Sequence, residues 1–440
     1  MRGLSRIGLL VVGLTLPLIG FAAMQDQSDF EHGVIQYAST APADPVARLQ
    51  KRLDGGLAQL RFDDRWGYLP AVLEELKIPR SSQGLVFSKT SLQLVQISPR
   101  APRALYFNDD VYVGAVQGGS LMEVAAVDPR IGAVFYSLSQ DADVKPRFQR
   151  EFFTCLFCHD SAATSGVPGF TMLSVLTDDK GAAIPAAGTV AMSDRTPFAE
   201  RWGGWYVTGT HGDQRHWGNL TSSHKPDSLS DPKAFIARLN LDAGANLKSL
   251  RNRFDSSAYL SEHSDLVALT VLTHQTRTHN LITKANYDVQ TALHEEASSA
   301  SARAEATRAR VAAAVEPLLK AMMFVSEAQL RSPIAGTTSF AGDFTAQGPR
   351  DSRGRSLRDF DLQTRLFTYR MSYLIYTPAF DALPQPAKDY FYGRLLEILQ
   401  GRDRTRDFAT IPGDEKQAIL EILRETKPEF AKFAAEREPA

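Results

Sequence analysis

The chain has 440 residues, of which 43% are hydrophobic and 22% charged, and its formal net charge is −1 at neutral pH. This composition is typical of a globular protein, and the length allows one large domain or two to three smaller ones. The near-zero charge provides no general attraction to nucleic acid or to an anionic membrane surface, so neither is expected as a partner on electrostatic grounds.

The first residues have the pattern of an export signal. Arg2 and Arg6 precede an apolar run from Ile7 to Met24, with small residues near its end that suit a cleavage site. The run is also just long enough to stay uncleaved as a membrane anchor. Residues 1–23 are therefore expected to be a signal peptide or an N-terminal anchor, and either would place the rest of the chain in the periplasm.

A linker and a mixed region should follow. Residues 24–44 are polar and rich in Ala and Pro, which predicts an extended linker. Residues 45–145 begin with helical spacing of apolar residues at 45–53 and 69–76. The pattern then changes to period two and predicts an antiparallel meander or barrel-like sheet, with short strands at 85–88, 92–96, 104–107, 111–116, 121–127 and 133–137.

The pentapeptide Cys155-Leu-Phe-Cys-His159 is the motif around which the chain is organised. Cys-x-x-Cys-His is the attachment sequence of c-type haem, in which two thiols add to the porphyrin vinyl groups and the histidine ligates the iron. The sequence therefore predicts one covalent haem c on Cys155 and Cys158, with His159 as proximal ligand, within a haem-binding, cytochrome c-like region at 146–330.

Two other chemistries use a Cys-x-x-Cys pair. A structural zinc site needs about four protein ligands, but this chain has only two cysteines and no matching pair. A thioredoxin-like dithiol does not require the trailing histidine, so it is the stronger of the two alternatives.

The segments around the motif are expected to complete the haem site. Residues 147–155 look like a short helix that delivers the motif, and the Pro168 carbonyl could accept the Nδ1–H of the proximal histidine, although a simple loop breaker is the favoured interpretation. Residues 170–176 and 187–192 predict a β-hairpin. Residues 201–217 hold three tryptophans and two histidines, which suits either a porphyrin face or an aromatic core cluster.

Helices should dominate the rest of the chain. Apolar spacing predicts a helix from Leu266 to about Leu293, and residues 297–312 should continue it or form a second one. Residues 333–361 look like a loop. The C-terminal region at 331–440 is predicted to be helical at 362–376, 386–400 and 414–426. The expected fold class is α+β, with an antiparallel β-rich N-terminal half, a haem-attachment segment and a mainly helical C-terminal half.

The sixth iron ligand is not fixed by the sequence. His216 is the first choice because it follows the motif at a suitable distance within the aromatic segment, and Met192 is the second. Methionine ligation would raise the reduction potential, whereas a second histidine would lower it. The remaining candidates are Met172, His211, His274 and His279. The last two are five apart on a helix, so both cannot easily face one iron.

Several blocks together resemble a family of large, exported, single-haem bacterial proteins described as cytochrome c domain-containing. The blocks are Arg103–Gly114, Cys155–His159, Arg201–Gly212 with its Trp-Gly-Gly-Trp sequence, His274-Gln275 with His279-Asn280, and Ser372–Tyr376. The resemblance covers most of the mature chain. It implies c-type haem on the motif and no particular substrate.

Two functions are consistent with these expectations. One is electron transfer with a periplasmic redox partner protein. The other is a single-haem peroxidase- or oxygenase-like enzyme with an open or displaceable sixth position, and a gas or redox sensor is a third, weaker option. The size of the chain favours an enzyme, while the single motif favours electron transfer, because bacterial cytochrome c peroxidases carry two such motifs.

Overall fold

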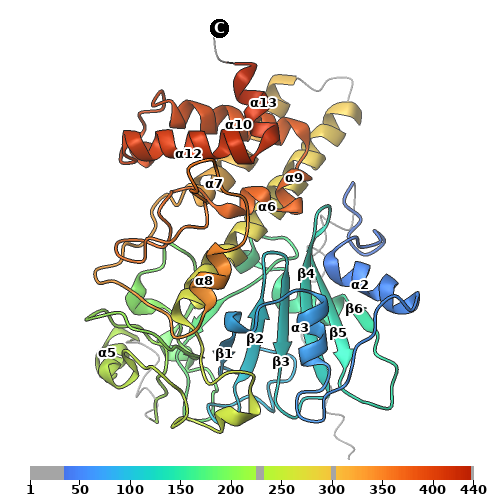
Figure 1. Cartoon of the computed structure of the whole chain (residues 1–440), viewed down its shortest axis with the longest axis vertical. Helices are drawn as coiled ribbons and strands as arrows, with labels where there is room; N and C mark the ends of the chain where they lie inside the picture. The colour runs from blue at the N-terminus through green and yellow to red at the C-terminus, as the bar shows by residue number, and fades with distance from the viewer. Residues whose placement is uncertain (1–33, 224–231, 299–303, 438–440) are drawn as a thin grey trace, which may run out of the picture.

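The structure is a computed structural model that describes residues 34–223, 232–298 and 304–437. The segment predicted as signal peptide or anchor lies outside these residues. Within them, a sheet occupies the N-terminal half and helices the C-terminal half, which confirms the α+β class (Figure 1). No helix of the described ranges is long and apolar enough to span a bilayer.

The fold is built on a seven-stranded antiparallel sheet in the order β6-β5-β4-β3-β2-β1-β9. The predicted meander is confirmed, because β2 to β6 pair consecutively through short turns. The strands are β1 (Gly84–Val86), β2 (Arg103–Phe107), β3 (Val111–Ala115), β4 (Leu121–Asp128), β5 (Gly132–Ser139), β6 (Phe148–Glu151) and β9 (Trp205–Tyr206). A separate hairpin of β7 (Leu173–Val175) and β8 (Thr189–Ala191) confirms the predicted one.

One predicted strand is wrong. Residues 92–96 form turns, and their apolar side chains Leu92, Leu94 and Val95 are exposed. The Gln93 amide instead donates to the Leu121 carbonyl at 2.9 Å, so this segment is fixed to the sheet by a side chain rather than by a backbone ladder. Alternating polarity alone could not distinguish the two arrangements.

Helices pack against both faces of the sheet (Figure 1). Val134 and Tyr136 of β5 pack on the side of α2 (Pro45–Asp54) and α3 (Leu69–Glu75), whereas Ala133 and Phe135 pack on the side of α6 (Leu266–Ser298). The period-two alternation of β5 thus divides its residues between two cores. The three helices occur where the sequence predicts them.

Residues 34–44, predicted as an extended linker, instead bury Tyr37, whose hydroxyl donates to the Ala133 carbonyl at 2.7 Å.

The C-terminal helices form a layer beyond one end of the sheet, reached by α6 (Figure 1). Predicted helices at 386–400 and 414–426 are confirmed as α10 and α12, and a second helix after α6 is confirmed as α7. The predicted helix at 362–376 is wrong: these residues form turns, and only Tyr373–Tyr376 makes a 3-10 turn. The layer and its connections contain α7 (Ala304–Met322), α8 (Phe340–Thr345), α9 (Pro378–Asp381), α10 (Gln385–Leu399), α11 (Arg406–Ala409), α12 (Gly413–Thr426) and α13 (Pro428–Ala435). The short helix α5 (Pro232–Ala237) lies away from this layer (Figure 1).

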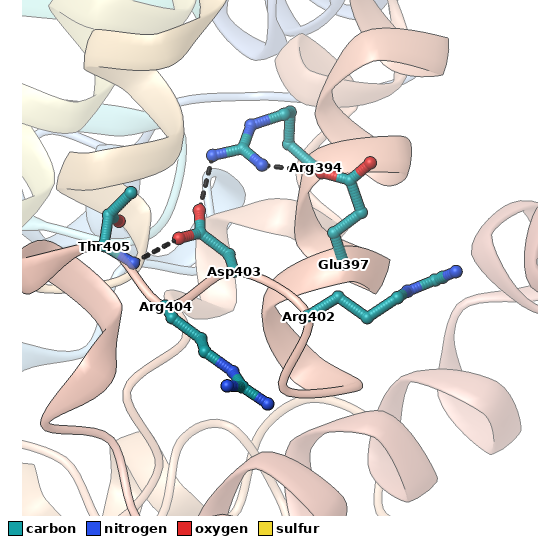
Figure 2. A pocket seen from close by; sticks show the side chains of 6 residues that line it. All are labelled: Arg394, Glu397, Arg402, Asp403, Arg404 and Thr405. Carbon is teal, nitrogen blue, oxygen red and sulfur yellow. Dashed lines mark hydrogen bonds and ion pairs between the residues drawn. The ribbon is translucent and has the colours of Figure 1, made fainter.

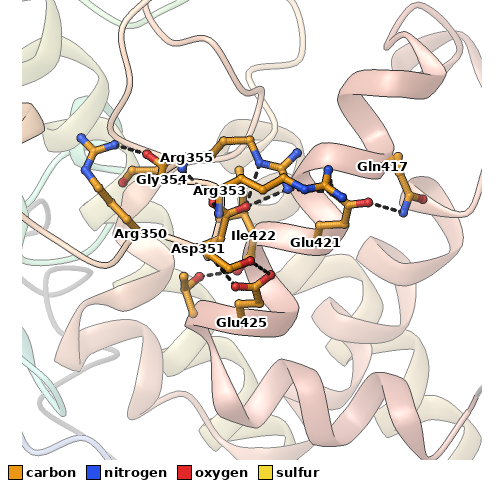
Figure 3. A network of polar contacts seen from close by, with 12 residues as sticks. Arg350, Asp351, Arg353, Gly354, Arg355, Gln417, Glu421, Ile422 and Glu425 are labelled. Carbon is orange, nitrogen blue, oxygen red and sulfur yellow. Dashed lines mark hydrogen bonds and ion pairs between the residues drawn. The ribbon is translucent and has the colours of Figure 1, made fainter.

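A charged network fastens the long loop before this layer to α12 (Figure 3). The buried Asp351 carboxylate accepts the backbone N–H groups of Arg353 and Arg355 and the Nε–H of Arg355 at 2.7–3.0 Å. The Arg355 guanidinium also pairs with Glu421 of α12 at 2.7 Å. The loop is therefore held by its own side chains, which explains how residues 346–372 are ordered with little regular structure.

The sheet combines strands that precede the Cys-x-x-Cys-His motif in the sequence with one strand that follows it. Strand β1 pairs with β9, with Leu85 opposite Tyr206 and Val86 opposite Trp205. One hydrophobic core also runs from Val86 on the sheet to Ala434 near the C-terminus. The two halves of the chain therefore share a sheet and a core. The boundaries at 45–145, 146–330 and 331–440 remain predictions.

Candidate functional site

The motif lies on its own short helix directly after the edge strand of the sheet. The predicted helix at 147–155 is wrong: Phe148–Glu151 is strand β6, paired with β5, and the helix α4 spans Phe153–His159. The alternation of Phe148, Gln149 and Arg150 between buried and less buried positions suits an edge strand, and short helices cannot be located from so few residues. Helix α4 places the two cysteines one turn apart.

The two thiols differ in burial. Cys155 is half-buried against the main core and Cys158 is exposed. Burial, followed by the nearby Glu151 and Glu123 carboxylates, raises the pKa of the Cys155 thiol to about 12. Redox dithiols require the opposite, a thiol with a lowered pKa at an electropositive helix end. The environment of Cys155 therefore disfavours the thioredoxin-like alternative, whereas a thioether to a porphyrin carries no charge to desolvate.

The His159 ring is held in one tautomer. Its Nδ1 lies 2.8 Å from the carbonyl oxygen of Gly169, which can only accept, so Nδ1 carries the proton and Nε2 keeps its lone pair. The Gly169 N–H donates back to the His159 carbonyl at 2.9 Å. Burial lowers the pKa of His159, which keeps the ring neutral. A neutral imidazole with a free Nε2 is the form that ligates haem iron. The acceptor is Gly169 rather than the proposed Pro168, one residue earlier.

Helix α6 fixes the loop that holds His159. The Asn280 side chain accepts the Phe170 N–H and donates to the Phe170 carbonyl, both at 2.8 Å. A Cβ on Gly169 would lie 2.5 Å from Asn280 Oδ1, so this approach requires glycine. Asn280 therefore orients His159 through the Gly169-Phe170 backbone. Sequence reasoning did not assign this role, and the only available signal was an Asn beside a His within an apolar helical pattern.

An apolar surface surrounds the exposed thiol. Phe153 and Phe157 lie one turn apart on α4 and are 90% and 80% exposed. Two adjacent phenylalanines in water are unusual and mark a surface that binds an apolar partner. The His159 ring lies on the other side of the helix, 4.7 Å from the Phe135 ring of β5. Thiols one turn apart and a neutral histidine with a free Nε2 together suit a covalently attached porphyrin on the side of the helix that holds His159.

Three of the candidate sixth ligands are engaged elsewhere. The His211 ring donates from Nδ1 to the Gln214 carbonyl at 2.8 Å and accepts the Asn246 N–H on Nε2 at 2.9 Å, so both nitrogens are used. His279 Nε2 lies 2.8 Å from the Asp109 carbonyl, and His274 Nε2 lies 2.8 Å from the Ser372 hydroxyl. As expected from their spacing, His274 and His279 face different neighbours.

His216 differs from these three histidines. It is 2% exposed, and neither ring nitrogen has a hydrogen-bond partner among the described residues; the Gly218 backbone faces the ring without completing a bond. Burial, with the positive charge of His211 and Arg215, lowers the pKa of His216 to about 3. The sulfur atoms of Met192 and Met172 accept the Trp202 N–H and the Thr273 hydroxyl at 3.1 and 3.3 Å.

The structure does not bring these candidates to His159. The His159 ring contacts Phe135 and Gly169, whereas His216 packs among Phe198, Trp202 and His211 in the aromatic segment. Trp202 is fully buried there. Among the described residues, no ring contact or hydrogen bond joins His159 to this cluster. His216 and Met192 therefore stay predictions as sixth ligands.

Two clefts of the described residues contain no part of the motif. One of about 460 Å³ is in the C-terminal layer (Figure 2). In it the Arg394 guanidinium pairs with Glu316, Glu397 and Asp403 at 2.6–2.7 Å, so its charge is neutralised internally. Another, of about 550 Å³, is lined by residues 323–327 and by Arg365 and Arg370, both paired with Glu415. Neither includes a residue of the haem motif.

Among the residues that the structure describes, no three His, Cys, Asp or Glu side chains gather closely enough to hold a bare metal ion. An iron already held by a porphyrin needs only one or two protein ligands, so this criterion concerns ions such as zinc. Comparison of the chain with protein-family models, with characterised proteins and with solved structures finds no match.

Proposed function

We propose that this chain is a periplasmic c-type cytochrome that carries one covalent haem and exchanges electrons with a redox partner protein. Cys155 and Cys158 would hold the porphyrin and His159 would be the proximal ligand. The bound haem would supply an iron that cycles between ferric and ferrous states.

The observation that carries the proposal is the fixed tautomer of His159. Its Nδ1–H donates to Gly169, and Asn280 fixes the loop behind Gly169 from a helix more than 100 residues later in the chain. Metal-ligating histidines almost always donate their other ring N–H in this way, so the arrangement suits a ligand role for Nε2 of His159. The raised pKa of Cys155 supports the same conclusion, because it disfavours thiol redox chemistry.

Localisation and partner follow from the cofactor. Covalent haem c is assembled outside the cytoplasm, and the N-terminal pattern suits export, with membrane attachment only if the segment stays uncleaved. The exposed pair Phe153 and Phe157 would place apolar surface next to the haem edge. A redox protein could approach the porphyrin there.

An enzyme with an open sixth position is the second candidate. It is favoured by one observation: among the described residues, no ring contact or hydrogen bond joins any of the six proposed sixth ligands directly to His159, and His216 packs in a different cluster. An iron with no sixth protein ligand would bind small molecules.

The optical spectrum of the haem-loaded protein, with and without carbon monoxide, tests the two candidates. Low-spin bands unmoved by carbon monoxide would mean two strong protein ligands and would support electron transfer. A high-spin oxidised form, or a prompt carbon monoxide shift, would mean an accessible iron and would overturn electron transfer in favour of the enzyme. If His216 is the sixth ligand, His216→Ala should change the first spectrum into the second.

A further inference from the structure

Half of one face of the sheet lacks a helical cover. Helix α6 covers the end of the sheet near Gly132, where the Tyr287 hydroxyl donates to the Ile131 carbonyl at 2.9 Å. Toward the other end, alternate residues of β2 and β4 are partly exposed, although the residues between them, which face α2 and α3, are buried. The partly exposed residues are Arg103, Leu105, Leu121, Glu123 and Ala125, here called the open half-face.

The open half-face adjoins the haem motif. Ala125 of this surface lies opposite Phe135 of β5, whose ring is 4.7 Å from the His159 ring. Glu123 lies opposite Ser137, whose hydroxyl donates to Glu151, four residues before Cys155. Leu105 and Ala125 pack against the edge of the core to which Cys155 and Leu156 also belong. Since the two ring nitrogens of His159 point away from each other, Nε2 faces away from Gly169, the residue that α6 supports.

Arg103 is a cation with unused hydrogen-bonding capacity on this surface. Its Nη2 pairs with Glu123 at 2.7 Å, and the two side chains are 18% and 17% exposed. Its Nε is buried without a partner among the described residues. The guanidinium crosses the middle strand β3 over Gly114, where any side chain would collide with it. Arg103 of β2 therefore lies over Gly114 of β3 and pairs with Glu123 of β4, which holds its guanidinium on the open half-face.

The neighbouring carboxylates do not depend on Arg103. The other oxygen of Glu123 accepts the Ser91 hydroxyl at 2.7 Å, and Glu151 accepts the Ser137 hydroxyl at 2.6 Å. An anionic group placed on this face therefore meets two satisfied carboxylates and one guanidinium whose ion pair, with Glu123, uses Nη2 alone.

We infer that the open half-face is the second wall of the haem site and that Arg103 binds a propionate carboxylate of the porphyrin. This inference rests on the proposed function. Leu105 and Ala125 offer an apolar floor for the macrocycle, and a guanidinium is the side chain best matched to a carboxylate, which it can bind with two parallel N–H groups. Arg103 can bind the carboxylate through Nη1 while Nη2 stays paired with Glu123.

The test is the resonance Raman spectrum of the ferrous, haem-loaded protein, in the region of the propionate bending modes. In Arg103→Gln the bending band should move to lower wavenumber, because the carboxylate loses a charged donor. The matched control is Arg150→Gln, which removes a cation from the same sheet, five residues before Cys155, but on the opposite face, where Arg150 stacks on Tyr37. The control should match the parent.

A second measurement stays informative if Arg103→Gln fails to fold. The full chain with both cysteines changed to Ser is titrated with haemin and with haemin dimethyl ester, whose propionates carry no charge. With Arg103 present, haemin should bind on the order of tenfold more tightly than the ester, the value of a charge-assisted hydrogen bond. In the additional Arg103→Gln variant the difference should disappear.

Two failures are distinguishable. A parent protein without covalent haem would overturn the proposed function. A parent with covalent haem whose propionate band is the same in Arg103→Gln, or whose cysteine-free form binds haemin and its ester equally, would overturn the role of Arg103 alone.

Discussion

At the residue scale, the site depends on a relay from helix α6 to His159. Asn280 is buried, and both groups of its amide bind the Phe170 backbone. The adjacent Gly169 carbonyl then sets the tautomer of His159. Outer partners of this kind orient a metal-ligating histidine and raise its basicity. The relay can be broken at two positions without touching the motif.

Asn280→Ala should loosen the proximal histidine. Two buried backbone groups of Phe170 lose their partners, so the free energy of unfolding should fall by about 2–4 kcal/mol. The reduction potential of the haem should rise, because a histidine with a weaker Nδ1 hydrogen bond is a poorer donor to ferric iron. Asn286→Ala is the matched control: Asn286 donates to the Arg130 carbonyl at 3.0 Å from the same helix, so stability should fall but the potential should not change. Equal potentials in all three proteins would contradict the relay.

Gly169→Ala should act through the same contact. The added methyl would meet Asn280 Oδ1 at 2.5 Å and push the loop away from the helix. We expect a loss of about 1–3 kcal/mol in stability and a fraction of high-spin haem in the optical spectrum. Gly342→Ala, in α8, is the control, since nothing lies within 4 Å of its added methyl. A Gly169→Ala protein with parental stability and spectrum would show that the close approach is unimportant.

His216 predicts a pH dependence of stability. Burial lowers its pKa to about 3 in the folded chain, below the ordinary value of 6.5. The unfolded chain therefore binds the proton more readily, and the stabilisation is fully present above about pH 6.5 and is lost as the pH falls toward 3. Between pH 7.5 and 4.5 the unfolding free energy should fall by about 1–3 kcal/mol less in His216→Gln than in the parent. His294 is exposed, so His294→Gln is the control variant. If the unfolding free energy changed equally with pH in the parent, His216→Gln and His294→Gln, the pH dependence would not come from His216.

The residues of the site were only partly predictable from the sequence. Cys155, Cys158 and His159 are neighbours in the chain and form a known pattern, so local sequence sufficed to nominate them. Gly169 was missed by one position, because a loop proline was the more obvious acceptor. Asn280 and Arg103 lie about 120 and 55 residues from the motif, and one sequence contains no signal for contacts at such distances.

At the element scale, long periodic segments were predictable and short ones were not. Helix α6 and strands β2 to β5 repeat their period often enough to be recognised. Helix α4 has seven residues and β9 has two, and both owe their structure to tertiary contacts. The failed helix at 362–376 has apolar residues at helical spacing, but its backbone bonds to residues far away: Leu362 accepts the Ile334 N–H and Thr364 the Leu330 N–H.

The stability of the loop at residues 346–372 should depend on Asp351. This carboxylate has no exposed side-chain surface and accepts three N–H groups. Asp351→Ala would leave the backbone N–H groups of Arg353 and Arg355 and the Arg355 guanidinium without this partner. We expect a loss of about 2–4 kcal/mol in unfolding free energy, measured by chemical denaturation. Glu75→Ala is the control, because it removes a pair with Arg52 that is largely exposed and should cost less than about 1 kcal/mol. Similar losses in both variants would argue against a special role for the network.

At the scale of the whole molecule, the strand pairing across the motif makes the two halves interdependent. Residues 84–86 and 205–206 complete one edge of the sheet, and the Phe107 ring lies 5.7 Å from that of Phe340 in α8. A fragment that ends at residue 165 would lack β9, α6 and the face that α6 buries. It should therefore show no cooperative thermal unfolding, whereas the chain from residue 34 onward should. Cooperative unfolding of the short fragment would show that the β-rich half is an independent domain.

The measurement that tests the central claim most directly is the mass of the denatured protein after expression with a c-type haem maturation system. The account predicts that the chain keeps the added mass of one haem after unfolding, and that the variant with Cys155 and Cys158 both changed to Ala has the mass of the polypeptide alone. A parent chain without added mass, or a double cysteine variant that still retains covalent haem, would contradict it.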